Sequence, residues 1–120
     1  MDKSNKRKTG ALYEHQAAVY LEANGYRIKE RNFQCRSGEI DLIAVDHGVL
    51  VFIEVKYRRT ARNGHPSEAV HARKQRQICR TALFYLIRYG IGTGIPCRFD
   101  VVCILGEEVQ LIRDAFPFHL

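Results

Sequence analysis

The sequence predicts a single α/β domain in which helices pack on a mixed β-sheet. Two observations predict this class: segments rich in β-branched residues alternate with two helical segments, and the elements follow the order αβββαββ. The chain has 120 residues, of which 46% are hydrophobic, and this size suits one compact domain. We expect a basic flexible tail over residues 1–9 and the domain over residues 10–120.

The first half of the domain is expected to contain one helix and three strands. The helix is predicted from about Ala11 to Asn24, because Gly25 tolerates the left-handed turn with which helices commonly end. Three strands are then expected over residues 26–33, 39–45 and 49–57. His47 and Gly48 indicate a tight turn between the second and third of these strands.

The second half is expected to contain a loop, a long helix and two further strands. Residues 58–65 are polar and include Gly64, which favours a mobile loop. The helix is predicted from Pro66 or Ser67 to about Tyr89, since proline fits a first helical turn and no later proline or glycine interrupts the segment. Two strands over residues 97–105 and 109–114 complete the predicted sheet.

Several classes of protein are excluded by composition. No apolar stretch is long enough to span a membrane, and the basic N-terminus is not followed by an apolar run, so we expect no membrane partner and a cytoplasmic location. The four cysteines form no C-x-x-C pair, which favours reduced thiols over a zinc site.

The positive charge is clustered. The formal net charge is +6, and lysines and arginines gather over residues 3–8, 56–62 and 73–80. Such clusters attract polyphosphates through counterion release, although basic runs are also common on solvated surfaces. Nucleic acid is therefore a favoured partner.

Four charged residues interrupt the second and third predicted strands. A two-residue loop at 47–48 would place Asp41 opposite Glu54 and Glu39 opposite Lys56, on one face of the sheet. Opposed carboxylates destabilise a strand pair by up to about 1 kcal/mol, and a divalent cation would offset their repulsion. A surface salt bridge between Glu39 and Lys56 is the alternative for that pair, but it does not explain two opposed acids within apolar strands.

The helices place two further polar residues on apolar faces. Glu14 falls on the same face as Ala17, Ala18 and Leu21, so a third carboxylate points toward the core. Gln75 lies on the apolar arc of the second helix, where it is either functional or a core amide satisfied by backbone groups.

The order of these motifs resembles a known family. Asp41 followed by Glu54-Val55-Lys56 resembles the D…(D/E)-x-K signature of restriction-endonuclease-like nucleases, whose core is αβββαβ. The strings "GEIDLIA", "LVFIEVKYR", "AVHARKQRQI" and "RFDVV" are, in this order, similar to the YraN-like family of predicted endonucleases, which is related to archaeal Holliday junction resolvases. The resemblance runs from about Gly10 to Asp114.

The resemblance implies a site and its ligands. It implies Mg²⁺ or Mn²⁺ held by Asp41, Glu54 and Val55, with Lys56 as the catalytic lysine. Glu14 would assist the metal site, Gln75 would flank it and Glu39 would be an accessory acid. Tyr13 stands where the family usually has a glycine before the glutamate, and Ile40 replaces the proline of the signature.

The function predicted from these residues is metal-assisted hydrolysis of phosphodiester bonds in DNA, with branched or junction DNA as a candidate substrate. The flanking backbone would be bound by Arg58, Arg59, Arg62, Arg73 and Arg76. Two alternatives stay open: a binding protein that keeps the fold but uses no metal, and a nuclease directed at RNA. A homodimer would suit substrates with two-fold symmetry.

Overall fold

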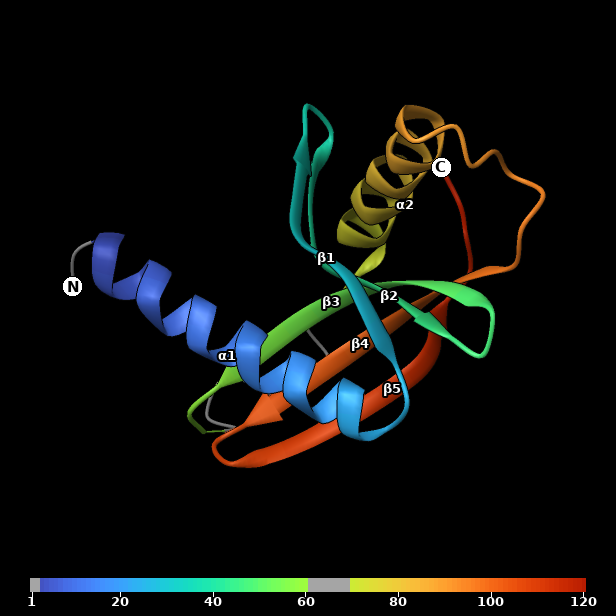
Figure 1. The fold of residues 1–120 in the computed structure, drawn as a ribbon. Coiled ribbons are helices and arrows are strands. Elements are labelled where there is room, and N and C mark those ends of the chain that lie inside the picture. The colour runs from blue at the N-terminus through green and yellow to red at the C-terminus, as the bar shows by residue number, and fades with distance from the viewer. Residues whose placement is uncertain (1–2, 61–69) are drawn as a thin grey trace.

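The computed structural model describes residues 3–60 and 70–120, with side chains from residue 7 onward, and has the element order αβββαββ that the sequence predicts (Figure 1). The elements are α1 (Lys3–Ala23), β1 (Arg27–Cys35), β2 (Gly38–Asp46), β3 (Val49–Arg58), α2 (Ala72–Arg88), β4 (Cys97–Leu105) and β5 (Glu108–Phe116). Neither helix in the described part of the chain is both long and apolar enough to span a membrane.

The five strands form one mixed sheet in the order β1-β2-β3-β4-β5. All neighbours are antiparallel except β3 and β4, which are parallel and therefore need the crossover that contains α2. Ala17, Ala18 and Leu21 of α1 pack on one face of the sheet, and Ile78 and Ala82 of α2 pack on the other. The predicted α/β class with a mixed sheet and flanking helices is confirmed.

Both helices begin at other residues than the sequence indicated. The first starts at Lys3 rather than near Ala11, so residues 3–9, expected to be tail, continue the helix. Lysine and arginine are good helix formers, and the single glycine at position 10 does not outweigh them. The second starts at Ala72, and Val70 before it is not helical, so a helix running unbroken from Pro66 was a wrong prediction. Positions 61–69, including most of the predicted loop, lie outside the described residues.

The turn between β2 and β3 is the predicted two-residue loop. His47 and Gly48 have φ values of 49° and 82°, and Asp46 faces Val49. Positive φ at both central residues matches the right-handed twist of the two strands. The pairing continues as far as Leu42 opposite Ile53 and ends there.

The end of that pairing corrects two predicted neighbours. Asp41 does not sit opposite Glu54 in the ladder, and Glu39 does not sit opposite Lys56. Glu39 instead pairs with Gln34 of β1. The reason is a change of direction in β2, which leaves β3 at Asp41.

The bend in β2 is visible in the packing on either side of Asp41. Ile40 packs in the cluster on the α2 side, whereas Leu42 packs in the cluster on the α1 side. In a regular strand these two side chains would share one face. Across the pair, Asn32 of β1 has φ 55° and the register passes from Arg31–Leu42 to Phe33–Ile40. Asp41 is thus released from both ladders.

Beyond the bend, the end of the β1–β2 hairpin rises beside α2 (Figure 1). Gly38 makes this approach possible, because a Cβ at that position would lie 2.9 Å from Nε2 of Gln77 on α2. Its φ of 148° also lies where side chains are rarely tolerated. The hairpin and α1 therefore flank the bend from two directions.

Candidate metal centre

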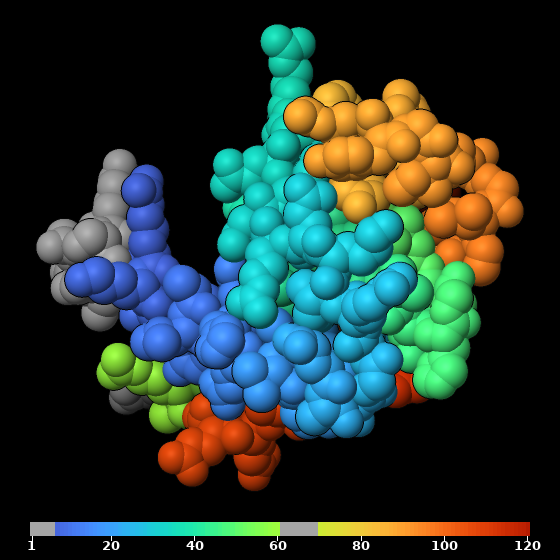
Figure 2. All heavy atoms as spheres, viewed as in Figure 1, coloured from blue at the N-terminus to red at the C-terminus, as the bar shows by residue number. Residues whose placement is uncertain are grey.

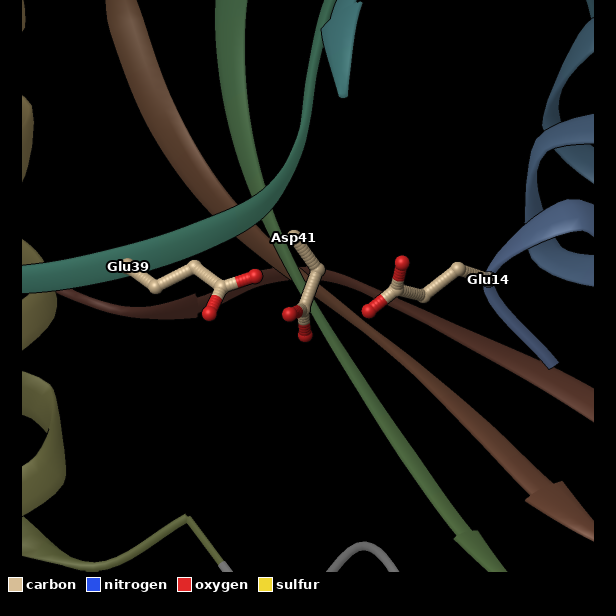
Figure 3. Close-up of side chains that lie close together, drawn as sticks. All are labelled: Glu14, Glu39 and Asp41. Carbon is tan, nitrogen blue, oxygen red and sulfur yellow. The ribbon is translucent and has the colours of Figure 1, made fainter. Parts of the chain in front are cut away.

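Three carboxylates meet at the bend. Ligand oxygens of Glu14, Glu39 and Asp41 all lie within 4.8 Å of one another, and the three side chains are half-buried. Figure 3 shows Glu14 from α1 and Glu39 from β2 pointing toward Asp41 from opposite sides. Clustered hard oxygen donors are the ligands that Mg²⁺ and Mn²⁺ prefer, so the donor set fits such an ion.

Asp41 is fixed by the backbone of the neighbouring strand. The Val55 N–H donates to Asp41 Oδ2 at 2.8 Å, in the place where a ladder hydrogen bond would otherwise continue. Val55 itself is buried and remains paired with Val102 of β4, so this donor is held rigidly. The Asp41 carboxylate is therefore held by a rigid backbone donor of the sheet and not by a donor on a flexible side chain.

The two glutamates of the cluster are each supported by one neighbour on β1. Asn32 forms a side-chain hydrogen bond with Glu14, and Gln34 Nε2 donates to Glu39 Oε2 at 3.4 Å. These bonds satisfy part of each carboxylate but supply no positive charge. The positive charge of Arg31 also lowers the pKa of Glu14, but it does not outweigh burial, so the negative charge of the cluster is only partly compensated.

Glu54 lies deeper and carries two ammonium groups. Its exposed fraction is 6%, and its Oε1 is 3.3 Å from Nζ of Lys56 and 4.0 Å from Nζ of Lys74. Lys56 comes from the same strand, while Lys74 comes from the first turn of α2. Glu54 contributes no oxygen to the cluster formed by Glu14, Glu39 and Asp41.

The electrostatics of the four acids favour binding of a cation. Burial and, after it, the charge of Glu54 raise the pKa of Asp41 to about 8, although the Val55 hydrogen bond opposes the shift. Burial also raises the pKa of Glu54, although Lys74 and Lys56 oppose this. The pKa of Glu14 is raised chiefly by burial. Carboxylates that resist ionisation in this way release that free-energy cost when a divalent ion binds them.

A second pair of buried acids, Asp46 and Asp100, differs from the acids at the bend in being neutralised by an arginine. Asp46 and Asp100 are also buried, but Arg98 donates to Asp46 at 2.7 Å and to Asp100 at 3.0 Å. Tyr26 adds a hydrogen bond to Asp100 at 2.6 Å. This group is fully paired and structural, whereas the acids at the bend retain free coordination capacity.

The cluster opens into a groove of about 560 Å³. Figure 2 shows this hollow between the blue atoms of α1 and the turquoise atoms of the β1–β2 hairpin. The residues that line it are Arg7, Gly10, Ala11, Glu14, Asn32, Gln34 and Glu39. A ligand can therefore reach Glu14 and Glu39 from solvent.

Gln75 is occupied elsewhere. Its Nε2 donates to the Val70 carbonyl at 3.1 Å, and its Oε1 lies 3.0 Å from Nε2 of His119 near the C-terminus. Of the two partners, Val70 is a backbone group, as expected for a core amide, whereas His119 is a side chain distant in the sequence. The flanking role implied by the resemblance stays a prediction.

The arginines expected to bind nucleic acid differ in exposure. Arg59 and Arg73 are exposed, whereas Arg58 and Arg76 are half-buried. Arg58 Nε is buried without a hydrogen-bond partner among the described residues. Arg62 lies outside the described part of the chain.

Sequence reasoning missed two residues of the site, Lys74 and Asn32. A signal for Lys74 was present, because it precedes Ile78 by four residues and so falls on the face of the helix that packs on the sheet. Asn32 gave no such signal, since its contact with Glu14 depends on how α1 lies across the sheet.

The described geometry defines an α/β protein with a mixed five-stranded sheet and a carboxylate cluster at a strand bend. Residues 13–104 match the model of the uncharacterised protein family UPF0102, and the chain belongs to this family. This confirms the family that the sequence motifs suggested.

Relatives of this family match nearly the whole chain. A UPF0102 protein of Lachnoclostridium phytofermentans is 49% identical over 115 residues, covering 96% of this chain and 98% of the relative. A UPF0102 protein of Symbiobacterium thermophilum is 58% identical over 96 residues, covering 80% of each chain. One from Syntrophus aciditrophicus is 47% identical over 113 residues, covering 91% of this chain and 88% of the relative.

Proposed function

We propose that this protein is a metal-dependent endonuclease that hydrolyses phosphodiester bonds in DNA. The observation that carries the proposal is the meeting of Glu14, Glu39 and Asp41 within 4.8 Å, beside a buried Glu54 that is in contact with Lys56. Acids that outnumber the cations beside them are costly for a fold. Binding of Mg²⁺ or Mn²⁺ would offset this cost.

Each residue has a distinct task in this proposal. A divalent ion at the cluster would supply Lewis acidity and lower the pKa of the attacking water. Asp41, Glu54 and the Val55 backbone would hold the metal ion, and Glu14 and Glu39 would add negative charge beside it. Lys56 donates to the reacting phosphate and orients the nucleophile, because its ammonium lies beside Glu54 and remains partly open to solvent.

Nucleic acid is the proposed substrate class because of charge, and DNA is proposed within that class because the motifs resemble those of DNA endonucleases. The formal net charge is +6, yet the centre itself is acidic, so cations elsewhere must bind the phosphate backbone. Arg59 and Arg73 are exposed near the ends of β3 and α2 that adjoin Lys56 and Lys74. Such contacts read the shape of a duplex or junction and carry little sequence information.

The direct test is a cleavage assay on linear, flapped and four-way-junction DNA with Mg²⁺ or Mn²⁺, with matching RNA substrates alongside. We expect metal-dependent cleavage of DNA that is lost when EDTA is added. Cleavage of RNA alone would show that the substrate is RNA and not DNA. Tight binding without cleavage in any metal would show that the protein binds nucleic acid and is not a nuclease.

Millimolar Mg²⁺ or Mn²⁺ is expected to raise the melting temperature of the wild-type protein. The ion binds the folded state only, and it relieves repulsion among the carboxylates, so stability rises with its concentration. At a concentration 100 times the dissociation constant the gain is about 2.7 kcal/mol. Thermal melts with EDTA, Mg²⁺ and Mn²⁺ measure this, and an unchanged melting temperature would contradict a metal centre.

Affinity for DNA is expected to fall steeply as salt rises. Arg59→Gln and Arg73→Gln should each weaken binding to all sequences and reduce the slope of log affinity against log salt by about 1. The matched control is Arg88→Gln, which removes an exposed arginine at the other end of α2. A salt-insensitive interaction, or an equal effect of the control, would contradict this mode of binding.

A further inference from the structure

Glu54 is approached by two lysines, one more than an ordinary ion pair requires. One ammonium group neutralises one carboxylate, yet Lys56 and Lys74 both approach Oε1 of Glu54, at 3.3 Å and 4.0 Å. The two lysine side chains are 28% and 31% exposed, so both can also reach a ligand in solvent.

The position of Lys74 on its helix is unfavourable for a residue that only supports the fold. It lies in the first turn of α2, where the helix dipole disfavours a cation, and that turn contains no acidic residue. An anion bound there would interact favourably with both the lysine and the helix end. Glu54 alone does not use the full capacity of Lys74 and the helix N-terminus to bind an anion.

The summed charge of the four acids and the two lysines indicates what kind of anion is bound. Glu14, Glu39, Asp41 and Glu54 carry four formal negative charges. Lys56 and Lys74, both on Glu54, offset two of these, and one divalent ion at the carboxylate cluster brings the formal charge to zero. Without Lys74 the set would remain negative and would repel a phosphodiester. A second lysine therefore matters most when the substrate is an anion.

We propose that Lys74 is a second substrate-binding lysine, which leaves Glu54 and donates to an oxygen of the phosphate that Lys56 also contacts. This inference rests on the proposed function and specifies how the centre accepts a backbone phosphate. A divalent cation at the carboxylate cluster adds positive charge close to Glu54, whose charge acts on Asp41, and repulsion between like charges then favours release of both ammonium groups. Their aliphatic stems are flexible enough to follow the phosphate.

The test compares Lys74→Gln and Lys74→Arg with Arg80→Gln, a control that removes an exposed cation six residues further along α2. The first measurement is Mn²⁺ affinity by calorimetry without nucleic acid. Lys74→Gln should bind Mn²⁺ about 3- to 10-fold more tightly, because a cation has left the centre. Weaker Mn²⁺ binding would overturn the proposal, since it would show that Lys74 serves to hold Glu54 in place.

The second measurement is the affinity for a labelled four-way junction in Ca²⁺. Lys74→Gln should lower this affinity about 3- to 10-fold beyond the effect of Arg80→Gln, and Lys74→Arg should restore it. An effect no larger than that of the control would overturn the proposal. If the wild type binds Mn²⁺ and the junction but cuts no substrate, the endonuclease function fails while these two measurements still decide the role of Lys74.

Discussion

Glu54→Ala and Lys56→Ala should each reduce DNA cleavage by a factor of about 10² to 10⁴, while any loss of DNA affinity stays within about 10-fold. Both side chains act at the reacting phosphate, whereas the exposed arginines hold the flanking backbone. Neither substitution should unfold the protein. Removing Glu54 eliminates a buried carboxylate, and the two lysines that it leaves are partly solvated.

The two variants should differ when the metal is varied. Excess Mn²⁺ should restore part of the rate of Glu54→Ala, because a missing ligand is offset by higher metal concentration. It should not rescue Lys56→Ala, which lacks a hydrogen-bond donor. Single-turnover rates across a manganese titration measure this difference.

Two control substitutions of the same type accompany these variants, Glu108→Ala and Lys29→Ala. Both remove an exposed charge of the same sign from strands at the edges of the sheet. If purified Glu54→Ala and Lys56→Ala cut as fast as these controls, the activity arises from another site or from a contaminant.

In EDTA, the free energy of unfolding of the wild-type protein is expected to fall as the pH rises from about 4 to about 8. The pKa of Asp41 is raised from 3.8 to about 8 in the folded protein, mainly by burial. Between these values the folded state keeps a proton that the unfolded chain has released, so a rise in pH favours unfolding. The stability from the protonated form is complete below 3.8 and is lost as pH passes the folded pKa.

The expected size of this effect is a few kcal/mol, since one pKa unit corresponds to about 1.4 kcal/mol and partial exposure of Asp41 reduces the full value. Asp41→Asn should flatten the pH dependence and stabilise the metal-free protein at pH 8. Its amide oxygen can still accept the Val55 N–H, so the backbone contact is preserved.

Urea unfolding at several pH values measures this prediction, with Glu107→Gln as a control that alters an exposed acid in a turn. Millimolar Mg²⁺ should remove most of the pH dependence in the wild type and have little effect on Asp41→Asn. A large loss of stability in Asp41→Asn at pH 8 would show that the carboxylate is structural.

The sequence by itself determined the order of elements, the α/β class and the turn at His47 and Gly48. These features depend on local causes: periodicity, β-branched content and the positive φ that the turn requires. It also indicated that Glu14 faces inward, because helical spacing fixes a residue's face relative to its apolar neighbours. The same logic would have found Lys74 on the face that carries Ile78.

Only the tertiary structure decided how the acids are arranged. Counting back from the turn placed Asp41 opposite Glu54, but β2 bends at Asp41 and carries Glu39 away from β3. A bend of this kind arises from packing of the hairpin against α2, with Gly38 close to Gln77, and this contact has no signature in strand periodicity.

The partners of the polar side chains were likewise set by distant residues. Asn32 reaches Glu14 and His119 reaches Gln75 only because α1 and the C-terminal residues lie across the sheet. Contacts between residues far apart in the chain depend on packing of complete elements, which local propensity does not encode. The residue types of the candidate centre could therefore be read from the sequence, whereas its geometry was fixed by the fold.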